Sequence, residues 1–270
     1  MIVITLMLIR GYLGHFMKEY EVYNDLKVPK GSRIILRLDG RNFHSLSKNL
    51  NLKRPYDDEF VKSMVSTSRD IFKEFSPLFI YTFSDEINVL LSEIPFSGRI
   101  EKLNSIFPSL VSSSLTIHLN NCFSSYSFNS YNDEDVENNL ISFDSRIVPI
   151  STDEDIVKYF KWRQDESWRN CINSYGYWTL RENFSAKETT KKLKGLKASD
   201  IHQLLFENGI NLNNTLTYEK RGIAVYKDRK KVVGFNPKVK EEECSYRNVL
   251  FVNKELPIFD NDFFRKLDII

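Results

Sequence analysis

The sequence predicts an α+β fold in which helices pack on one face of an antiparallel sheet. Two apolar runs of β type, 32–43 and 79–91, flank a stretch, 53–75, whose apolar residues recur at helical spacing. The second run is interrupted at Ser84-Asp85-Glu86, which predicts a hairpin turn. Strand, helix, hairpin, helix and strand therefore follow one another over the first 150 residues, an order that favours an α+β sandwich.

Each element of that order has its own local signal. The run 32–43 is rich in Ile and Leu, as expected of a strand that is buried on both faces. Asp57 is a candidate N-cap for the first long helix. A second helix is expected from about Arg99, and a further strand is expected over 143–150.

The second half of the chain is predicted to be helical and basic, and to pack against this sheet. Ser185 and Glu188 form a capping box in front of a lysine-rich helix. Residues 187–197 contain five lysines and one glutamate, a composition suited to phosphate contacts or, alternatively, to a solvated helix face. From Leu216 onward the pattern returns to β-type alternation.

Composition limits the class of protein. The 270 residues are 41% hydrophobic and 27% charged, with a net charge of +2, which is globular composition. Three widely spaced cysteines and four scattered histidines indicate neither a disulfide framework nor a zinc site, and are typical of the cytoplasm. The apolar N-terminal stretch is far shorter than the roughly 20 residues that span a bilayer, so no membrane association is expected.

Two carboxylates carry the strongest chemical signal. Asp39 ends the first apolar run and is followed by Gly40, and Asp85 lies in the expected hairpin turn. Buried neighbouring carboxylates repel each other unless a cation or a proton lies between them. Mg²⁺ fits, because it takes oxygen ligands from carboxylates, carbonyls and phosphates, and a metal pair supports phosphoryl transfer. The alternative is that Asp39-Gly40 is a plain β-turn and Asp85 a cap.

These residues also carry a resemblance. "RLDGRNFH" (37–44), "RPYDD", "SDE" and "WRQD" resemble the tRNA(His) guanylyltransferase family, and more specifically its archaeal and bacterial branch of Thg1-like 3′–5′ polymerases. The similarity runs from about Tyr20 to about Gly222. It implies a polymerase-palm-like, ferredoxin-like fold with two Mg²⁺ per active site, held by Asp39, Gly40 and Asp85. The catalytic set that it implies is Asp39, Asp85 and Glu86.

The resemblance further implies a nucleotide-binding set, which begins with the segment from Asp39 to His44 and Ser84. The guanidinium, amide and imidazole donors of this segment suit triphosphate oxygens. Arg54 holds the family's basic position before a proline, and Arg99 with Lys102 matches its triphosphate-binding pair. The full set is Asp39, Gly40, Arg41, Asn42, Phe43, His44, Ser84, Asp85, Arg54, Arg99 and Lys102.

The implied activity is addition of a nucleotide, preferably GMP from GTP, to the 5′ end of tRNA after activation of that end with ATP. Trp168 stands where the eukaryotic motif has histidine, which favours templated addition over strict tRNA(His) identity. The expected partners are tRNA, GTP and ATP, in a homotetramer. Weaker candidates for tRNA contacts are Arg163, Arg169, Asn170, Lys191, Lys192 and Lys194.

The resulting domain division has three parts. Residues 1–16 are expected to be a non-native or flexible extension, 17–150 the palm-like catalytic domain, and 151–270 a helical and β-tail part that completes the domain and contacts tRNA.

Two other functions stay open. A nucleotide cyclase or cyclic-dinucleotide synthase would use equivalent aspartates without RNA, and a non-catalytic RNA-binding protein would not need them.

Overall fold

The computed structural model describes residues 20–123, 140–236 and 241–270, so the expected extension 1–16 lies outside the described residues. The elements, in chain order, are β1 Arg33–Gly40, α2 Phe43–Asn49, α3 Asp58–Phe75, β2 Phe79–Phe83, β3 Glu86–Leu90, η1 Phe96–Gly98, α4 Ile100–Cys122, β4 Phe143–Ile150, α5 Asp153–Arg181, α6 Ala186–Leu193, α7 Ala198–Glu207, η2 Leu212–Asn214, α8 Thr217–Arg221, β5 Ile223–Asn236, β6 Glu241–Asn253 and α9 Asn261–Lys266.

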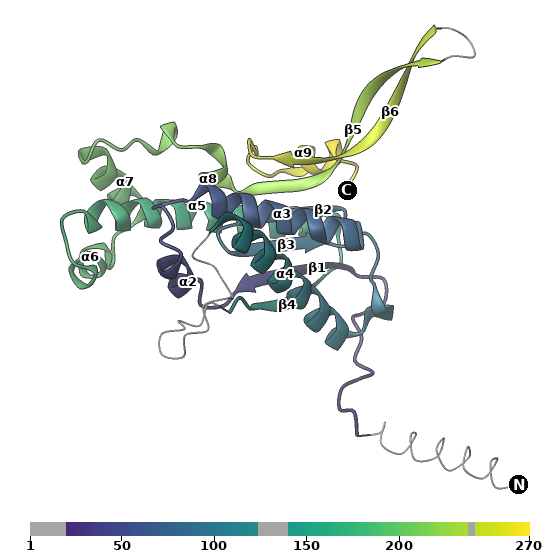
Figure 1. Cartoon of the computed structure of the whole chain (residues 1–270), viewed down its shortest axis with the longest axis horizontal. Coiled ribbons are helices and arrows are strands. Elements are labelled where there is room, and N and C mark those ends of the chain that lie inside the picture. Colours follow the sequence, from purple (N-terminus) through teal and green to yellow (C-terminus); the bar gives the residue numbers. More distant parts are fainter. Residues whose placement is uncertain (1–19, 124–139, 237–240) are drawn as a thin grey trace, which may run out of the picture.

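The described strands form one antiparallel sheet in the order β4-β1-β3-β2-β5-β6 (Figure 1). β2 and β3 are joined by the two-residue turn Ser84-Asp85, as expected. The register places Asp39, near the end of β1, opposite Glu86, the first residue of β3. This register brings the end of β1 beside the hairpin turn.

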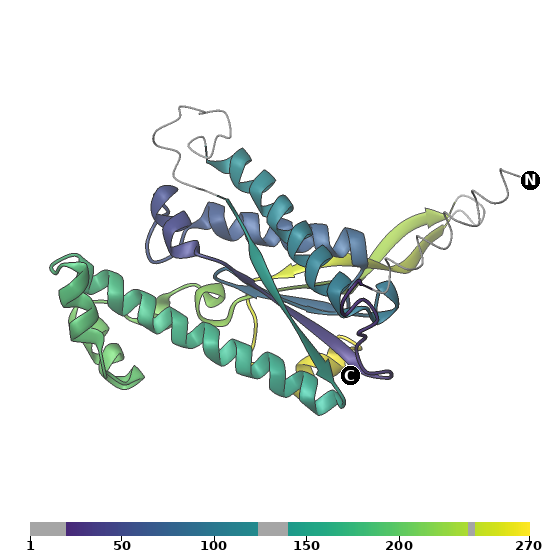
Figure 2. The same ribbon diagram turned by 90° about the horizontal axis from the view of Figure 1, so that it is seen from below.

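Helices cover both faces of the sheet. The side chains of Ile34, Leu36 and Leu38 pack into a core with α3 and α4. Ile35, which points the other way, packs with α5 and with the C-terminal segment around Phe259. Figure 2 shows α5 on the opposite side of the sheet from α3 and α4. The α+β, palm-like expectation is thus confirmed, with the second half of the chain packed against the free face.

The start of α3 is set by local chemistry. The side chain of Asp57 accepts hydrogen bonds from the backbone N–H groups of Glu59 and Phe60, so it caps the helix as predicted. Asp57 also accepts from the backbone N–H of Lys53 at 2.9 Å, which ties the preceding loop to the helix. This loop, 50–57, therefore has a defined course beside the hairpin turn.

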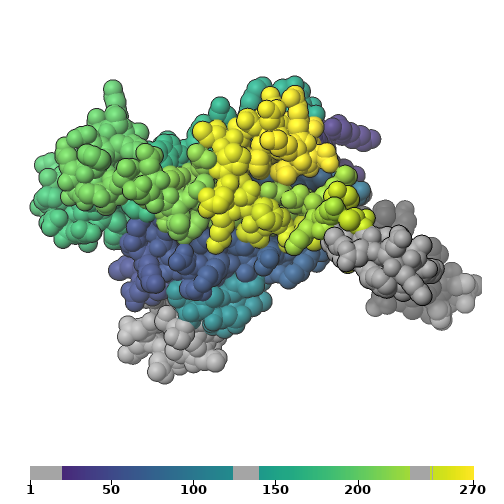
Figure 3. All heavy atoms as spheres, turned by 90° about the horizontal axis from the view of Figure 1, so that it is seen from above, coloured from purple at the N-terminus to yellow at the C-terminus, as the bar shows by residue number. Residues whose placement is uncertain are grey.

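The second half adds a helical module and a long ribbon. Ile172 of α5, Ile201 and Leu205 of α7, and Leu212 form a small separate core. The predicted capping box of Ser185 and Glu188 is present at the start of α6. In the space-filling view the green α6–α8 region lies at one end of the molecule (Figure 3). The strands β5 and β6 form a ribbon that extends away from the rest of the sheet (Figure 1). Across the described residues, no helix is long and apolar enough to span a membrane.

Candidate active site

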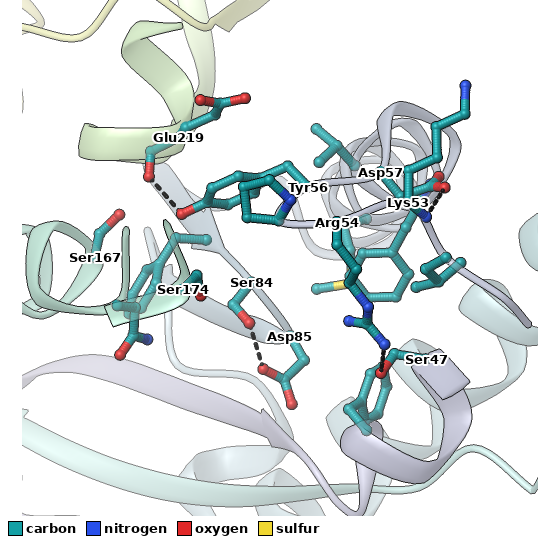
Figure 4. A pocket seen from close by; sticks show the side chains of 18 of the residues that line it. Ser47, Lys53, Arg54, Tyr56, Asp57, Ser84, Asp85, Ser167, Ser174 and Glu219 are labelled. Atoms are coloured by element: carbon teal, nitrogen blue, oxygen red, sulfur yellow. Dashed lines mark hydrogen bonds between the residues drawn. The ribbon is translucent and has the colours of Figure 1, made fainter. Parts of the chain in front are cut away.

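Asp39 and Asp85 lie together at one end of the sheet. The backbone N–H of Gly40 donates to the carbonyl oxygen of Asp85 at 3.1 Å, which fixes the end of β1 to the hairpin turn. The hydroxyl of Ser84 donates to Oδ1 of Asp85 at 2.8 Å and orients that carboxylate (Figure 4). The structure thus brings together the three residues that the sequence singled out as ligands of a metal.

The electrostatics of Asp85 show how close these charges are. Its pKa is raised to about 6, first by burial and then by the negative charges of Asp39 and Glu86, while the hydrogen bond from Ser84 opposes the shift. A carboxylate of this kind favours a proton or a cation beside it. Asp85 is therefore suited to binding a positive ion at neutral pH.

Gly40 is required by space rather than by an unusual backbone angle. A Cβ atom at this position would lie 2.4 Å from the ring of Phe43 and 3.0 Å from the Cβ of Asp85. Any side chain here would force the turn and the start of α2 apart. Gly40 therefore allows the end of β1, the hairpin turn and Phe43 to approach one another closely.

Glu86, the third residue of the "SDE" motif, is already paired. Its carboxylate accepts from Nε of Arg163 at 2.8 Å and from Nη2 at 2.6 Å, and its side chain is 8% exposed. Asn88 donates to the same carboxylate at 2.8 Å, and the hydroxyl of Tyr159 donates to Asn88 at 2.6 Å. Glu86 is thus held by α5, so we interpret it as a residue that positions the turn.

A cavity of about 550 Å³ opens beside Asp85. Figure 4 shows the carboxylate of Asp85 and the side chains of Arg54 and Ser47 around the same open space. Its size falls within the range of roughly 300–1,000 Å³ typical of small-molecule sites. The walls come from α2, the loop before α3, the hairpin turn, the second half of α5, and α8.

The cavity lining combines basic and apolar side chains. Lys53, Arg54 and His44 line it, and a nucleotide's phosphates need such groups. The guanidinium of Arg54 lies 4.7 Å from the ring centroid of Trp178 and donates to the hydroxyl of Ser47 at 2.8 Å. Apolar contacts for a base come from further lining residues, namely Leu46, Phe60, Met64, Tyr177 and Trp178.

Several of the predicted binding residues line this cavity. Phe43, His44, Ser84, Asp85 and Arg54 do so, and Asn170, expected as a tRNA contact, does as well. Four others, Asp39, Gly40, Arg41 and Asn42, do not line it, although they directly precede α2. Asn42 adopts a left-handed backbone and accepts from the hydroxyl of Ser45.

Arg99 and Lys102 do not line this cavity. Arg99 forms an isolated bridge with Lys27, and the carbonyl of Gly98 accepts from Val28, so α4 begins beside the residues that precede β1. The strand β3 carries the chain from the Asp85 turn to that opposite end of the sheet, roughly 17 Å for five residues. The expected triphosphate-binding role of this pair does not fit the cavity described above.

The residues expected to contact tRNA lie in different environments. Arg163 is buried in its ion pair with Glu86, which does not fit a role on the tRNA-facing surface. Arg169 is exposed and pairs with Glu166 on the same helix. Lys191 and Lys192 on α6, and Lys194 just after it, are exposed and lie outside the cavity lining. Trp168 packs against His202 of α7, with 5.5 Å between ring centroids, and so belongs to the small core of the helical module.

Sequence reasoning missed the α5 and α8 walls. Tyr177 and Trp178 line the cavity although they lie about 90 residues after the hairpin turn, and neither was among the predicted site residues. Glu219 also lines the cavity; its backbone carbonyl accepts from the hydroxyl of Tyr56 at 2.9 Å, and its carboxylate accepts from Tyr175 at 2.7 Å. The contact between Arg54 and Trp178 required the fold to be seen.

The residues present suit a hard metal ion completed by a substrate. Within the described residues there is no group of three or more His, Cys, Asp and Glu side chains that could enclose a metal. Asp39, Asp85 and the Gly40 carbonyl would supply a partial oxygen shell, and Mg²⁺ is commonly held by one or two carboxylates together with substrate phosphates. The raised pKa of Asp85 fits such a site.

An antiparallel palm-like sheet, with two acidic residues at adjacent strand ends beside a nucleotide-sized cavity, defines the class of nucleotidyltransferases. The family "tRNAHis guanylyltransferase" matches residues 14–151, and "Thg1 C terminal domain" matches residues 154–256. Because the first match covers more than half of the chain, this protein belongs to the tRNAHis guanylyltransferase family.

Individual relatives agree. The tRNA(His) guanylyltransferase of Debaryomyces hansenii is 30% identical over 219 residues, 79% of each chain. That of Saccharomyces cerevisiae is 28% identical over 78% of this chain and 88% of its own. Its crystal structure matches with a TM-score of 0.65 and 26% identity, over 77% of this chain and 90% of that one. A bacterial Thg1-like protein in complex with ATP shares the fold, with a TM-score of 0.71 and 22% identity over 95% of this chain and 98% of its own.

Proposed function

We propose that this protein adds a nucleotide, preferably GMP from GTP, to the 5′ end of a tRNA in the 3′–5′ direction. The observation that carries the proposal is the pair Asp39 and Asp85 at adjoining strand ends, beside a cavity lined by basic side chains and aromatic rings. Family membership supports the substrate class, since relatives carry the name tRNA(His) guanylyltransferase.

The chain's residues have separate roles in this reaction. Lys53, Arg54 and His44 bind the triphosphate of the incoming nucleotide, and Trp178 with Tyr177 contacts its base. The 3′-hydroxyl of that nucleotide attacks the 5′ phosphate of the RNA, which has been activated with ATP or is a triphosphate, and AMP or pyrophosphate leaves. Two Mg²⁺ ions held by Asp39, the Gly40 carbonyl and Asp85 would activate the hydroxyl and neutralise the leaving group.

Because the attacking hydroxyl belongs to the incoming nucleotide, no side chain of the cavity lining has to act as a nucleophile. The protein raises the rate by positioning the substrates and by stabilising charge. Ser84 orients Asp85, and the Glu86–Arg163 pair holds the turn in place. The exposed lysines after Ser185 and the exposed basic stretch 227–231 of β5 contact the tRNA backbone, so binding weakens steeply with salt. In this proposal the enzyme is a cytoplasmic homotetramer.

The test is incubation with labelled GTP, Mg²⁺, and either tRNA(His) lacking its added guanylate or a tRNA lacking its first nucleotide. Labelled product from the first substrate indicates tRNA(His) maturation, and product from the second indicates templated repair. Asp85→Asn should abolish both products, whereas Glu93→Gln, which changes an exposed carboxylate in the loop after β3, should leave them unchanged. Turnover of GTP without RNA would instead indicate a cyclase, and unchanged labelling by Asp85→Asn would defeat the proposal.

A further inference from the structure

Like charges face each other across β1 and β4. The register pairs Asp39 with Asp144 and Arg37 with Arg146. Since side chains alternate along a strand, all four point to the face on which Ile35 meets α5. Like charges directly opposite each other on adjacent strands destabilise a sheet. If an acidic residue faced a basic residue in each pair, there would be no repulsion. As it is, the acidic pair suits a bound cation, and the arginine pair suits a bound anion.

Within the part of the chain that the structure describes, Arg37 has no ion-pair partner and Arg146 has only a loose one. Arg163 and Arg33 form close ion pairs at 2.6 Å with Glu86 and Asp153. For Arg37, by contrast, no ion pair is found among the described residues, and its Nε atom is buried without a hydrogen-bond partner. Arg146 is 59% exposed, and its Nε lies 3.8 Å from Asp144, too far for a hydrogen bond. Arg37 and Arg146 lie opposite each other on β1 and β4, and two adjacent guanidinium groups are suited to binding a phosphate.

An exposed indole adjoins this pair. Trp162 of α5 is 51% exposed, and its ring centroid lies 5.7 Å from Cζ of Arg37 and 4.4 Å from Cζ of Arg163. An exposed aromatic ring beside cationic groups is a platform on which a nucleic-acid base stacks. β4 is an edge strand of the sheet (Figure 2), and the side chain of Arg146 on it is exposed, so a large ligand can reach this guanidinium.

We propose that Arg37, Arg146 and Trp162 form a second subsite, which binds the phosphorylated 5′ end of an RNA strand. The phosphate lies on the two arginines, and the terminal base stacks on the indole. None of these three residues lines the cavity that takes the incoming nucleotide. Arg37 is two residues from Asp39 on the same face of β1, roughly 7 Å away, so a phosphate bound there lies within reach of the Asp39–Asp85 pair. The inference rests on the proposed function for the identity of its RNA.

The experiment compares a short acceptor-stem RNA with a 5′ phosphate and the same RNA with a 5′ hydroxyl, by fluorescence anisotropy in Mg²⁺ without nucleotide. The intact protein should prefer the phosphorylated RNA by about tenfold, as expected for charge-assisted hydrogen bonds to one phosphate. Arg37→Gln and Arg146→Gln should each reduce that preference to about twofold or less, because each removes charge-assisted hydrogen bonds to the phosphate. Arg69→Gln removes one exposed charge from α3, across the sheet, and should keep the preference.

Further variants separate the roles and the folding effects. Arg146→Lys should keep only part of the preference, since it retains the charge without the guanidinium fork. Trp162→Leu should weaken both RNAs equally, whereas Trp162→Phe should not. Because Arg146→Gln removes a cross-strand repulsion, its melting temperature should not fall. No phosphate preference in the intact protein, or a preference that survives both glutamine variants, overturns the inference.

Two other results remain distinguishable from these. Loss of GTP affinity in the arginine variants, with the 5′-phosphate preference retained, would assign the arginines to a free nucleotide and would also overturn the inference. Failure of the intact enzyme to extend tRNA would defeat the proposed function but would not change this binding comparison, which involves no turnover.

Discussion

Arg163 on α5 forms a bidentate ion pair with Glu86 at the start of β3, with contacts of 2.8 and 2.6 Å. The guanidinium is flanked by Trp162 and Phe83, whose ring centroids lie 4.4 and 5.5 Å from its Cζ atom. Glu86 directly follows Asp85, so this buried pair fixes the long helix of one face to the turn that carries the candidate metal ligand.

Breaking this pair from one side should be costly. Arg163→Met leaves the Glu86 carboxylate buried without a counter-charge, so we expect a loss of about 3–5 kcal/mol in the free energy of unfolding. The double variant Glu86→Leu with Arg163→Met removes both charges and should recover most of that loss. Urea unfolding measures both. Equal destabilisation of the double and the single variant would contradict the pairing.

The pH dependence of stability should follow Asp85. Its pKa in the folded protein is raised to about 6, whereas an unfolded chain has a value of about 3.9. The folded state therefore binds more protons between these values, and the stability of the metal-free protein falls as the pH rises from about 4 to about 6. Asp85→Asn removes this contribution, so its melting temperature in EDTA should exceed that of the intact protein at pH 7.

At pH 5 the advantage of Asp85→Asn should shrink, because the native carboxyl is then largely protonated. Differential scanning calorimetry at the two pH values gives the comparison. An Asp85→Asn variant that is less stable than the intact protein at pH 7 would mean that burial and the neighbouring charges do not destabilise the ionised carboxylate.

Arg54 should control nucleotide affinity. Its guanidinium lies over Trp178 and beside Ser47 at the mouth of the cavity, where it can bind a phosphate. Arg54→Gln should weaken GTP binding by about tenfold or more, the effect of losing a charge-assisted hydrogen bond. Equilibrium dialysis with Arg69→Gln as the matched charge control measures this effect, and equal affinities of the two variants would exclude Arg54 from the site.

A cluster outside the site should stabilise the fold. Asp70 of α3 accepts hydrogen bonds from Ser114 and His118 of α4, both at 2.8 Å, and from Lys73. Burial alone would raise the pKa of Asp70, but the bonds from Lys73, His118 and Ser114 outweigh it and lower the pKa to about 2. Its stabilisation is therefore fully present above pH 4 and is lost as the pH falls toward about 2.

Asp70→Asn should accordingly lower the free energy of unfolding at pH 7 by about 1–3 kcal/mol. The control is Asp262→Asn, which alters a carboxylate that is 78% exposed, and a change within about 0.5 kcal/mol is expected there. Chemical unfolding of the intact protein and of both variants at pH 7 and at pH 2 gives the comparison. If Asp70→Asn cost as much at pH 2 as at pH 7, the charge of Asp70 would not be the cause.

The acidic end of the site, with Asp39 and Asp85, was predictable because its signals are local. A strand that ends on Asp39-Gly40, and a hairpin whose turn is Ser84-Asp85, are visible in short stretches of sequence. Antiparallel pairing of neighbouring strands then brings the two ends together. The capping signals of Asp57 and Ser185 were predictable for the same reason.

The cavity walls were not predictable, because they depend on how distant helices pack. Trp178 reaches Arg54 only since α5 crosses the far face of the sheet, and helical spacing alone does not say which turn of a helix meets which strand. The pair Arg99 and Lys102 was placed by motif alone. Its position follows from the direction of β3, which leads the chain away from the Asp85 turn before α4 begins.

The central claim is that Asp39 and Asp85 together hold divalent metal beside a bound nucleotide. The most direct measurement is the anomalous scattering of Mn²⁺ in crystals soaked with Mn²⁺ and GTP. We predict Mn²⁺ bound directly to the carboxylate oxygens of both residues, at about 2.0–2.2 Å, with GTP phosphates completing the shell. Anomalous density that is absent there while GTP occupies the cavity, or that lies on other residues alone, would contradict the account.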